Sequence, residues 1–516
     1  MDNEIIFLLS AFWMLMIPSN HYHDGYDRSL YSSFLINISP PKYSLLTLSR
    51  ITNRCCNLSH TCPLRARKRS TPLWYCVTEK TVNVVKNAPT RNILDFRYFC
   101  DHLEVYRENI RNRGLQIDVD GIKSLYQRQC ELISQIQQLR KERNQVAERL
   151  KNIANISSTK EKNEYKEQGK VLKTDIANLE KQLETVEETL FIEAMKVPNL
   201  THPDVPIGAE EQARVLKVVD AAQSAPPEHV DNHLLIAERL DLADFESAAK
   251  VSGQKFYYLK NAAALLEVAL INWSLNHVVS KGFTPLSTPD LVRTEVVLAC
   301  GFQPRGEASQ IYRVADSDLC LVGTAEIPLG GYYMNQILDE QSLPIRMVAF
   351  GHCFRKEVGS AGQASKGLYR VHQFTKVEMF VLCKPNQSDA LLEDLLNIQM
   401  EMFSSLGFSY RVLDMPSQDL GNPAYRKFDV EAWMPGRSGF GEISSASNCT
   451  DYQARRLNIR YRDKQGNIHY VHTLNATACA IPRMIITILE NFQLSNGEIL
   501  IPEPLQSYIG NRKTIE

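Results

Sequence analysis

Two runs of heptad-spaced hydrophobic residues, lying between Gly121 and Pro198, constrain the fold of this chain more than any other feature of its sequence. In the first run apolar residues recur every seven positions at Leu125, Leu132, Leu139, Val146 and Ile153, with companions at Ile122, Ile136 and Leu150. The second run has Tyr165, Leu172, Leu179 and Val186, with companions at Ile176, Leu183 and Leu190. Two such runs separated by a short polar segment predict an antiparallel coiled-coil hairpin over about residues 121–195.

Charge is distributed unevenly over the two predicted helices. Residues 121–155 carry seven basic and three acidic side chains, whereas residues 156–195 carry six basic and nine acidic ones. A basic helical face suits the phosphates of a nucleic-acid backbone. A solvated coiled-coil surface has the same composition, however, and charge alone favours that simpler interpretation.

Composition bounds the class of protein. The chain has 516 residues, of which 44% are hydrophobic and 23% charged, and this is ordinary for a globular protein of about three domains. The 58 basic and 59 acidic side chains nearly cancel, so a uniformly basic nucleic-acid binder is excluded. Prolines 198, 203 and 206 end the hairpin, and residues 223–227 are typical of a linker. We therefore expect a leader (1–78), an N-terminal domain carrying the hairpin (79–228) and a large body (229–516).

The expected leader differs sharply from the rest of the chain. Its apolar residues 5–17 are too few for a membrane span of about 20 residues, and Asp2 and Glu4 stand where a secretion signal needs positive charge. From Arg28 to Thr78 there is no acidic residue but there are eight Lys or Arg, with many Ser and Thr. This composition predicts a mitochondrial presequence and hence the mitochondrial matrix. A basic tail or a nuclear address at residues 65–69 is the alternative.

The absence of common metal-binding and nucleotide-binding motifs limits the kinds of site that the body (229–516) can contain. None of the twelve cysteines forms a C-x-x-C pair, so their spacing argues against a zinc site. The chain has neither a P-loop nor a Gly-rich dinucleotide fingerprint in a β-α-β series. Strand-like runs at 346–353, 367–382 and 408–413, together with helices predicted at 262–280 and 484–494, indicate an antiparallel α+β domain.

Two groups of residues are candidates for binding a nucleotide. Arg355 and Arg370 flank a Gly- and Ser-rich loop in a predicted hairpin, and a planar guanidinium binds phosphate in a bidentate manner. Glu442 and Ser445 offer hard oxygen ligands suited to a Mg²⁺ ion that bridges phosphates. Taken singly, each group is equally typical of a surface ion pair or a packed strand–helix junction.

Together these segments resemble the class II seryl-tRNA synthetases of the mitochondrial, bacterial-like type. Lys281 to Pro289 is similar to motif 1 of that family, and Gly323 to Glu326 is similar to its serine-binding TAE loop. Phe354 to Glu357, with residues 367–380, is similar to motif 2, and Asn475 to Arg483 is similar to motif 3. The resemblance extends from about residue 94 to 510 and therefore includes the hairpin.

The resemblance implies a fold, an activity and a set of partners. The fold would be an α+β class II catalytic domain (229–516), preceded by a tRNA-binding domain (79–228) with a coiled-coil arm. The activity would be activation of L-serine with ATP and Mg²⁺, followed by transfer of the seryl group to tRNA(Ser). The protein would be a homodimer joined through motif 1, from Gly282 to Pro289, with no association with a membrane.

The resemblance also implies roles for individual residues. Those expected to bind serine are Thr324, Ala325, Glu326, Arg355, Glu378, Asn475 and Thr477. Those expected to bind ATP are Arg355, Lys356, Glu357, Arg370, Val371, Phe374, Glu442, Ile443, Ser444, Ser445 and Arg483. Arg355, Arg483 and Glu442 would be catalytic, and Glu442 and Ser445 would hold Mg²⁺.

Two carboxylates in a serine pocket make chemical sense, because serine offers both an ammonium and a hydroxyl group. A site committed to bonding that hydroxyl rejects alanine strongly. The alternative hypothesis is a non-catalytic paralogue of the synthetase that binds RNA or a protein partner. The presence of Glu326, Arg355, Glu378 and Arg483 favours the enzyme.

Overall fold

The structure is a computed structural model of the whole chain, and it describes residues 93–153, 159–220, 230–302, 310–357 and 367–516. The predicted leader (1–78) and linker (223–227) lie outside the described residues, as does nearly all of the loop in motif 2.

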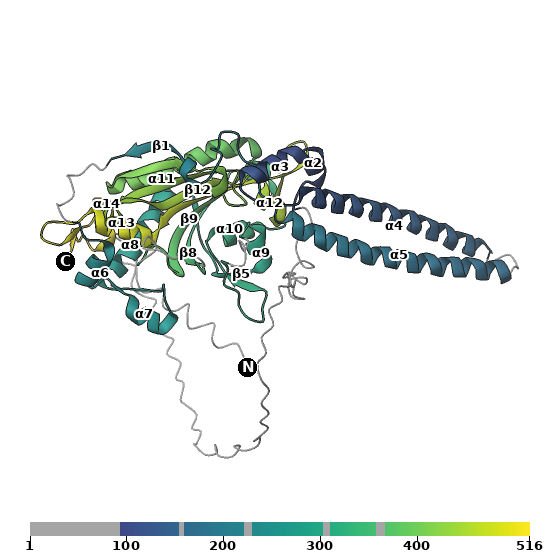
Figure 1. Cartoon of the computed structure of the whole chain (residues 1–516), viewed down its shortest axis with the longest axis horizontal. Helices are drawn as coiled ribbons and strands as arrows, with labels where there is room; N and C mark the ends of the chain where they lie inside the picture. Colours follow the sequence, from purple (N-terminus) through teal and green to yellow (C-terminus); the bar gives the residue numbers. More distant parts are fainter. Residues whose placement is uncertain (1–92, 154–158, 221–229, 303–309, 358–366) are drawn as a thin grey trace, which may run out of the picture. The chain divides into compact units, whose positions relative to one another are not determined.

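The heptad segment forms two long antiparallel helices that lie side by side, α4 (Val119–Ile153) and α5 (Thr159–Ala194) (Figure 1). Heptad residues such as Leu132 on α4 and Ile176 on α5 are buried. The Arg140 guanidinium lies 2.8 Å from the carboxylate of Glu180, which ties the two exposed edges together. The helical hairpin predicted from the heptads is therefore present.

Two shorter helices, α2 (Phe96–Asp101) and α3 (Leu103–Asn112), pack where the hairpin begins and ends. They form a small core around Phe99, Tyr106 and Ile122, to which Leu190 of α5 contributes. This core closes the hairpin at the end opposite to its connecting loop.

The body is built on an eight-stranded sheet of order β1-β10-β11-β12-β15-β9-β8-β4. Its strands are β1 (Arg214–Val219), β4 (Thr284–Ser287), β8 (Ile345–Phe354), β9 (Gln373–Cys383), β10 (Tyr410–Asp414), β11 (Arg426–Met434), β12 (Gly439–Asn448) and β15 (His472–Ala480). All neighbouring strands are antiparallel except β4 and β8. The antiparallel α+β prediction is confirmed.

The other described helices and strands connect and cover this sheet. They are α6 (His233–Arg239), α7 (Phe245–Ser252), α8 (Asn261–Ser280), α9 (Thr294–Ala299), α10 (Glu326–Tyr332), α11 (Ser388–Leu406), α12 (Tyr452–Leu457), α13 (Ile481–Asn491), α14 (Glu503–Gln506), β2 (Ala243–Asp244), β3 (Tyr258–Leu259), β5 (Leu291–Arg293), β6 (Leu319–Leu321), β7 (Ile337–Asp339), β13 (Arg460–Arg462), β14 (Ile468–Tyr470), β16 (Ile499–Leu500) and β17 (Thr514–Ile515).

The two faces of the sheet have different character. Along β11, Phe428, Val430 and Ala432 point into the main hydrophobic core, which they share with α8, α11 and α13. Because side chains alternate along a strand, Asp429 and Glu431 face the opposite way. That second face carries the polar residues of the site, and α9, α10 and α12 cover part of it through a smaller hydrophobic core.

Helix α8 is long and apolar enough to cross a membrane, by length and composition only. Its residues Leu266, Leu270 and Trp273 are buried in the main core of the body. The buried core helix of a soluble protein passes the same test, so this match is weak evidence of a membrane span.

Several boundaries differ from the sequence-based expectation. Strand β10 begins at Tyr410 rather than at 408, and helix α13 ends at Asn491 rather than at 494. Strand β9 begins at Gln373 rather than at 367, because Gly367 has a φ of +64° and starts a turn. Helix α13 begins at Ile481 rather than at 484, since proline is tolerated in the first turn of a helix and Pro482 lies there. Strand β1 precedes the expected domain boundary at 228, yet it pairs with β10 of the catalytic sheet.

Candidate active site

The ends of β8 and β9 bring Arg355 and Phe374 together. The guanidinium carbon of Arg355 lies 5.2 Å from the centroid of the Phe374 ring. The Arg355 backbone N–H donates to the carbonyl of His372 at 2.9 Å, and its Nε donates to the carbonyl of Gly323 at 3.3 Å. Arg355 therefore joins the motif 2 hairpin to the loop that carries Thr324 and Glu326.

The remaining motif 2 candidates lie around this arginine. Arg370 Nη1 donates to Glu357 Oε2 at 3.4 Å, so the two ends of the hairpin are paired. The Lys356 ammonium instead lies 5.8 Å from the centroid of the Tyr312 ring. Val371 is buried, and this restricts its side chain to packing.

Glu326 is a buried carboxylate with two amide donors. Its Oε1 accepts from Gln453 Nε2 at 2.6 Å and from Asn475 Nδ2 at 3.0 Å. Its backbone N–H donates to Thr324 Oγ1 at 3.3 Å. Burial and then the charge of Glu378 raise the pKa of Glu326 to about 7, although the bond from Gln453 opposes this.

Glu378 on β9 and Thr477 on β15 are direct cross-strand partners. Thr477 Oγ1 donates to Glu378 Oε2 at 3.2 Å, and Lys376 makes an ion pair with the same carboxylate. Lys376 Nζ also donates to Thr477 Oγ1 at 3.4 Å. All three side chains are buried, so solvent screens the charges of this cluster little.

A β-bulge at Ile443 places Glu442 and Ser445, the two candidate Mg²⁺ ligands, on one face of β12. Residues three apart on a regular strand point to opposite faces. Here, however, Glu431 pairs with Glu442 while Asp429 pairs with Ser445, so the extra residue restores a common face for Glu442 and Ser445.

The side chains of Ile443 and Ser444, between Glu442 and Ser445, lie on the opposite face of β12. Ile443 is part of the main hydrophobic core, and Ser444 donates to the carbonyl of Thr477 at 2.6 Å. Any contact of Ile443 or Ser444 with ATP would therefore come from the backbone.

Arg483, in the first turn of α13, is paired with Glu442. Its Nη1 lies 3.1 Å from Glu442 Oε2 and donates to the Glu442 carbonyl at 2.9 Å. Against the effect of burial, Arg483 and Lys427 hold the pKa of Glu442 at about 2. Glu442 is consequently ionised at neutral pH, as a cation ligand must be.

The donor set fits Mg²⁺ bound jointly with phosphates. Glu442 and Ser445 supply hard oxygens, and Mg²⁺ at phosphate sites usually takes only one or two carboxylates from the protein. Within the described ranges there is no cluster of three His, Cys, Asp or Glu residues for a metal ion. With two oxygens from the protein, a Mg²⁺ ion here would take its other ligands from phosphates and water.

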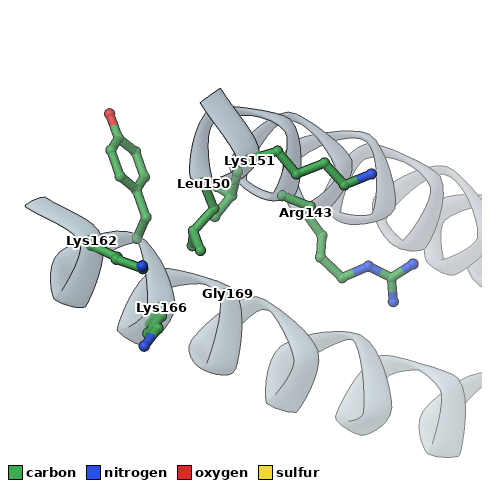
Figure 2. Close-up of a pocket in the computed structure, with 9 residues that line it drawn as sticks. Arg143, Leu150, Lys151, Lys162, Lys166 and Gly169 are labelled. Carbon is green, nitrogen blue, oxygen red and sulfur yellow. The ribbon is translucent and has the colours of Figure 1, made fainter. Parts of the chain in front are cut away.

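A second candidate site lies between α4 and α5 near their connecting loop (Figure 2). It is an open cleft of about 460 Å³, and its lining includes Val146, Leu150 and Gly169. The other residues that line it are Arg143, Ala147, Lys151, Lys162, Tyr165 and Lys166. Four cations and no acidic side chain line this cleft, so its potential is suited to an anionic partner.

Comparisons with known proteins match both the N-terminal part of the chain and its catalytic body. The family model described as seryl-tRNA synthetase N-terminal domain matches residues 93–201, and that of the tRNA synthetase class II core domain (G, H, P, S and T) matches residues 312–492. The serine--tRNA ligase of Treponema denticola is 46% identical over 424 residues, which is 81% of this chain and 99% of the relative. The chain belongs to the seryl-tRNA synthetase family.

Solved seryl-tRNA synthetases have the same fold. That of Pyrococcus horikoshii, complexed with ATP, is 37% identical with a TM-score of 0.74 and covers 82% of this chain and 99% of its own. The cytoplasmic serine-tRNA ligase of Naegleria fowleri, in complex with AMP, is 28% identical with a TM-score of 0.70, covering 83% and 98%.

Sequence reasoning missed several residues of this seryl-tRNA synthetase site. Lys376 had a usable signal, because it precedes Glu378 by two positions and so shares its face of β9. Gln453 had none, since it reaches Glu326 from α12, far away in sequence. Tyr369 and Arg437 were also missed. The Tyr369 ring contacts the guanidinium of Arg483, and Arg437 contacts the same ring.

Proposed function

We propose that this chain is a serine--tRNA ligase, which activates L-serine with ATP and transfers it to tRNA(Ser). The observation that carries the proposal is the buried pair Glu326 and Glu378, next to Arg355 on the polar face of the sheet. Two buried carboxylates match the ammonium and the hydroxyl of serine, and Arg355 matches its carboxylate.

The first step needs no protein nucleophile. The serine carboxylate attacks the α-phosphorus of ATP in line, and pyrophosphate leaves from the opposite side. Glu326 and Glu378 hold serine by its polar groups, while Arg355 and Arg483 offset the charge on the phosphates. Phe374 offers its ring to the adenine. Mg²⁺, held by Glu442 and Ser445, would supply further neutralisation of the phosphate charge.

The second step is attack by the terminal ribose hydroxyl of the tRNA on the activated carbonyl of seryl-adenylate. The new ester bond replaces the bond to the phosphate, and AMP and the hydroxyl proton are released. The helical hairpin supports a second contact with the tRNA, because four cations gather at the cleft between α4 and α5. Phosphates of the tRNA backbone are the matching anions.

The proposed assembly is a homodimer joined through motif 1. In this region β4 forms the edge of the sheet. Helix α8, which precedes it, exposes Leu265 and Val268 by about half of their surfaces. Exposed apolar side chains beside a sheet edge are typical of a surface that is covered in an oligomer. Sedimentation velocity of the purified chain tests the stoichiometry.

The proposed location is the mitochondrial matrix. The support is the basic, acid-free stretch from Arg28 to Thr78. Mass spectrometry of the N-terminus of the protein recovered from mitochondria tests this, because import would remove the leader.

Serine-dependent exchange between ATP and pyrophosphate tests the activity itself. We expect exchange by the wild-type chain and its loss in Arg355→Ala, because no other described guanidinium reaches both Gly323 and the Phe374 ring. Arg346→Ala is the matched control, since Arg346 lies on β8, the strand that Arg355 directly follows, and pairs with Asp394 outside the site. A wild-type chain without exchange would instead favour the non-catalytic paralogue.

A further inference from the structure

Two guanidinium groups contact the same tyrosine ring at the edge of the site. The guanidinium carbons of Arg437 and Arg483 lie 4.5 and 4.8 Å from the centroid of the Tyr369 ring. Arg483 comes from α13, Tyr369 follows the motif 2 loop, and Arg437 ends the 3-10 turn Pro435–Arg437 between β11 and β12. Three separate segments thus converge on one point.

The space occupied by Arg437 exists because residue 441 is glycine. A Cβ atom at Gly441 would lie 3.1 Å from Arg437 Nη1, 3.1 Å from Tyr369 Cε2 and 2.8 Å from Met434 Sδ. A Cβ atom there would clash with Met434 and would require Arg437 and Tyr369 to shift by a few tenths of an ångström. Gly441 also directly precedes Glu442, so the space adjoins the phosphate end of the site.

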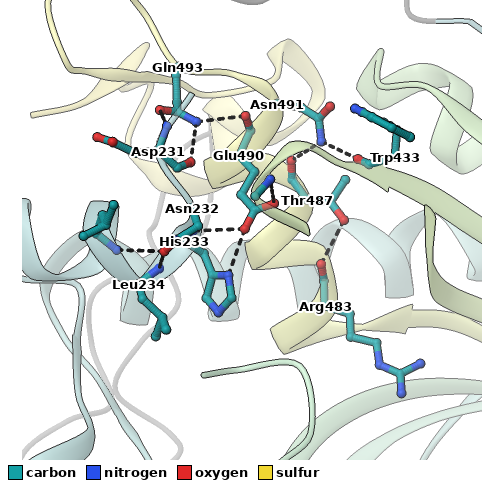
Figure 3. Close-up of polar contacts among 12 residues, drawn as sticks. Asp231, Asn232, His233, Leu234, Trp433, Arg483, Thr487, Glu490, Asn491 and Gln493 are labelled. Atoms are coloured by element: carbon teal, nitrogen blue, oxygen red, sulfur yellow. Dashed lines mark hydrogen bonds and ion pairs between the residues drawn. The ribbon is translucent and has the colours of Figure 1, made fainter. Parts of the chain in front are cut away.

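Helix α13 fixes both arginines. Arg483 lies in its first turn and Glu490 in its last (Figure 3). The buried Glu490 accepts from the Gly436 N–H at 3.0 Å through Oε2, and from the His233 N–H at 3.0 Å through Oε1. The turn that carries Arg437 is therefore held by the same helix that carries Arg483.

Arg437 and Arg483 differ in how their charges are paired within the described residues. Arg483 is paired with Glu442, whereas in the described part of the chain no acidic side chain pairs with Arg437, which is exposed. Two like charges on one ring repel unless an anion lies between or beside them.

We propose that Arg437 binds the β- and γ-phosphates of ATP, which leave as pyrophosphate, together with Arg483. This inference rests on the proposed function and adds a residue to it. Arg437 helps to hold the leaving group and does not contact serine or the adenosine moiety.

Arg437→Ala and Arg437→Gln, made in the full chain, test this. In serine-dependent exchange we expect the KM for ATP and for pyrophosphate to rise about 5- to 20-fold, as for loss of one exposed charged hydrogen bond. The KM for serine and the inhibition constant of AMP should not change, because AMP lacks both outer phosphates. Arg411→Ala is the control, since Arg411 contacts the Phe440 ring nearby but is paired with Glu431.

Unchanged KM values for ATP and pyrophosphate would overturn the inference while the proposed function stands. An equal loss of AMP and serine binding would overturn it as well, because it would show a general distortion of the site. Calorimetric titration with inorganic pyrophosphate gives a readout that does not depend on activity. Wild-type and Arg437→Gln chains with the same pyrophosphate affinity would refute the assignment even if exchange were absent.

Discussion

Arg113 links the N-terminal helices to the catalytic body, and Arg113→Met should uncouple them. This arginine directly follows α3 and is only 5% exposed. It donates to the carbonyls of Gly421 at 2.6 Å, Ala424 at 2.7 Å and Leu200 at 3.0 Å, and to Thr201 Oγ1 at 3.0 Å. Burial lowers the pKa of Arg113 to about 10, and all of these acceptors are neutral.

The magnitude follows from these four bonds. Each acceptor that loses a charged donor while buried costs about 1–3 kcal/mol. The variant no longer buries a guanidinium, which offsets part of the loss, so a net destabilisation of the junction of about 3–5 kcal/mol is expected. The catalytic sheet itself loses no strand pairing, because the four bonds of the Arg113 side chain end at residues 200–201 and 421–424, which lie outside the strands.

Paired kinetic assays distinguish the junction from the site. We expect Arg113→Met to retain ATP–pyrophosphate exchange within about twofold and to lose tenfold or more in aminoacylation of tRNA, as expected for 1.4 kcal/mol or more. Residues 93–201 should exchange amide hydrogens faster. Arg111→Met, an exposed neighbour on α3, is the control. Aminoacylation within twofold of wild type, or an equal loss of both activities, would refute this reasoning.

Two further predictions concern the serine pocket. The KM for serine should fall as pH rises from about 6 to about 8, because Glu326 has a pKa of about 7 and accepts hydrogen bonds from serine best when it is ionised. Steady-state kinetics across this pH range should show the fall, and a KM that does not change with pH would contradict the prediction. Lys376→Met should destabilise the chain by about 3–5 kcal/mol, because Glu378 is left buried without its cation. Adding Glu378→Gln should recover part of that loss in urea denaturation, and simple additivity of the two changes would argue against the pair.

Local patterns predicted the helical hairpin well. Heptad spacing is a property of neighbouring residues, so the buried positions of α4 and α5 follow from the sequence alone. Residue type alone singled out Arg355, Arg370, Glu442 and Ser445, and the other site candidates came from resemblance. The structure brings Arg355 to Phe374 and Arg483 to Glu442. Those contacts join segments that no periodicity connects.

Other features of the site and the sheet depend on three-dimensional geometry that cannot be read from sequence spacing. Glu442 and Ser445 share a face only because of the bulge at Ile443, and a regular strand would have separated them. Gln453 reaches Glu326 because α12 packs against β15. Strand β1 joins the sheet by pairing with β10, almost 200 residues away in the sequence. The sequence-based boundary at 228 therefore assigned β1 to the N-terminal domain instead of the catalytic sheet.

The strand order of the sheet also has a consequence for how the chain is made. Strand β15 lies between β12 and β9, yet it is the last of the eight to leave the ribosome. Until it emerges, β1-β10-β11-β12 and β9-β8-β4 are two separate sheets with open edges, whereas the hairpin, built from local contacts, can fold early. The strand that carries Asn475 and Thr477 therefore joins the two half-sheets and brings its residues to the serine pocket in a single event, and a nascent chain that stops short of it exposes two edges open to aggregation.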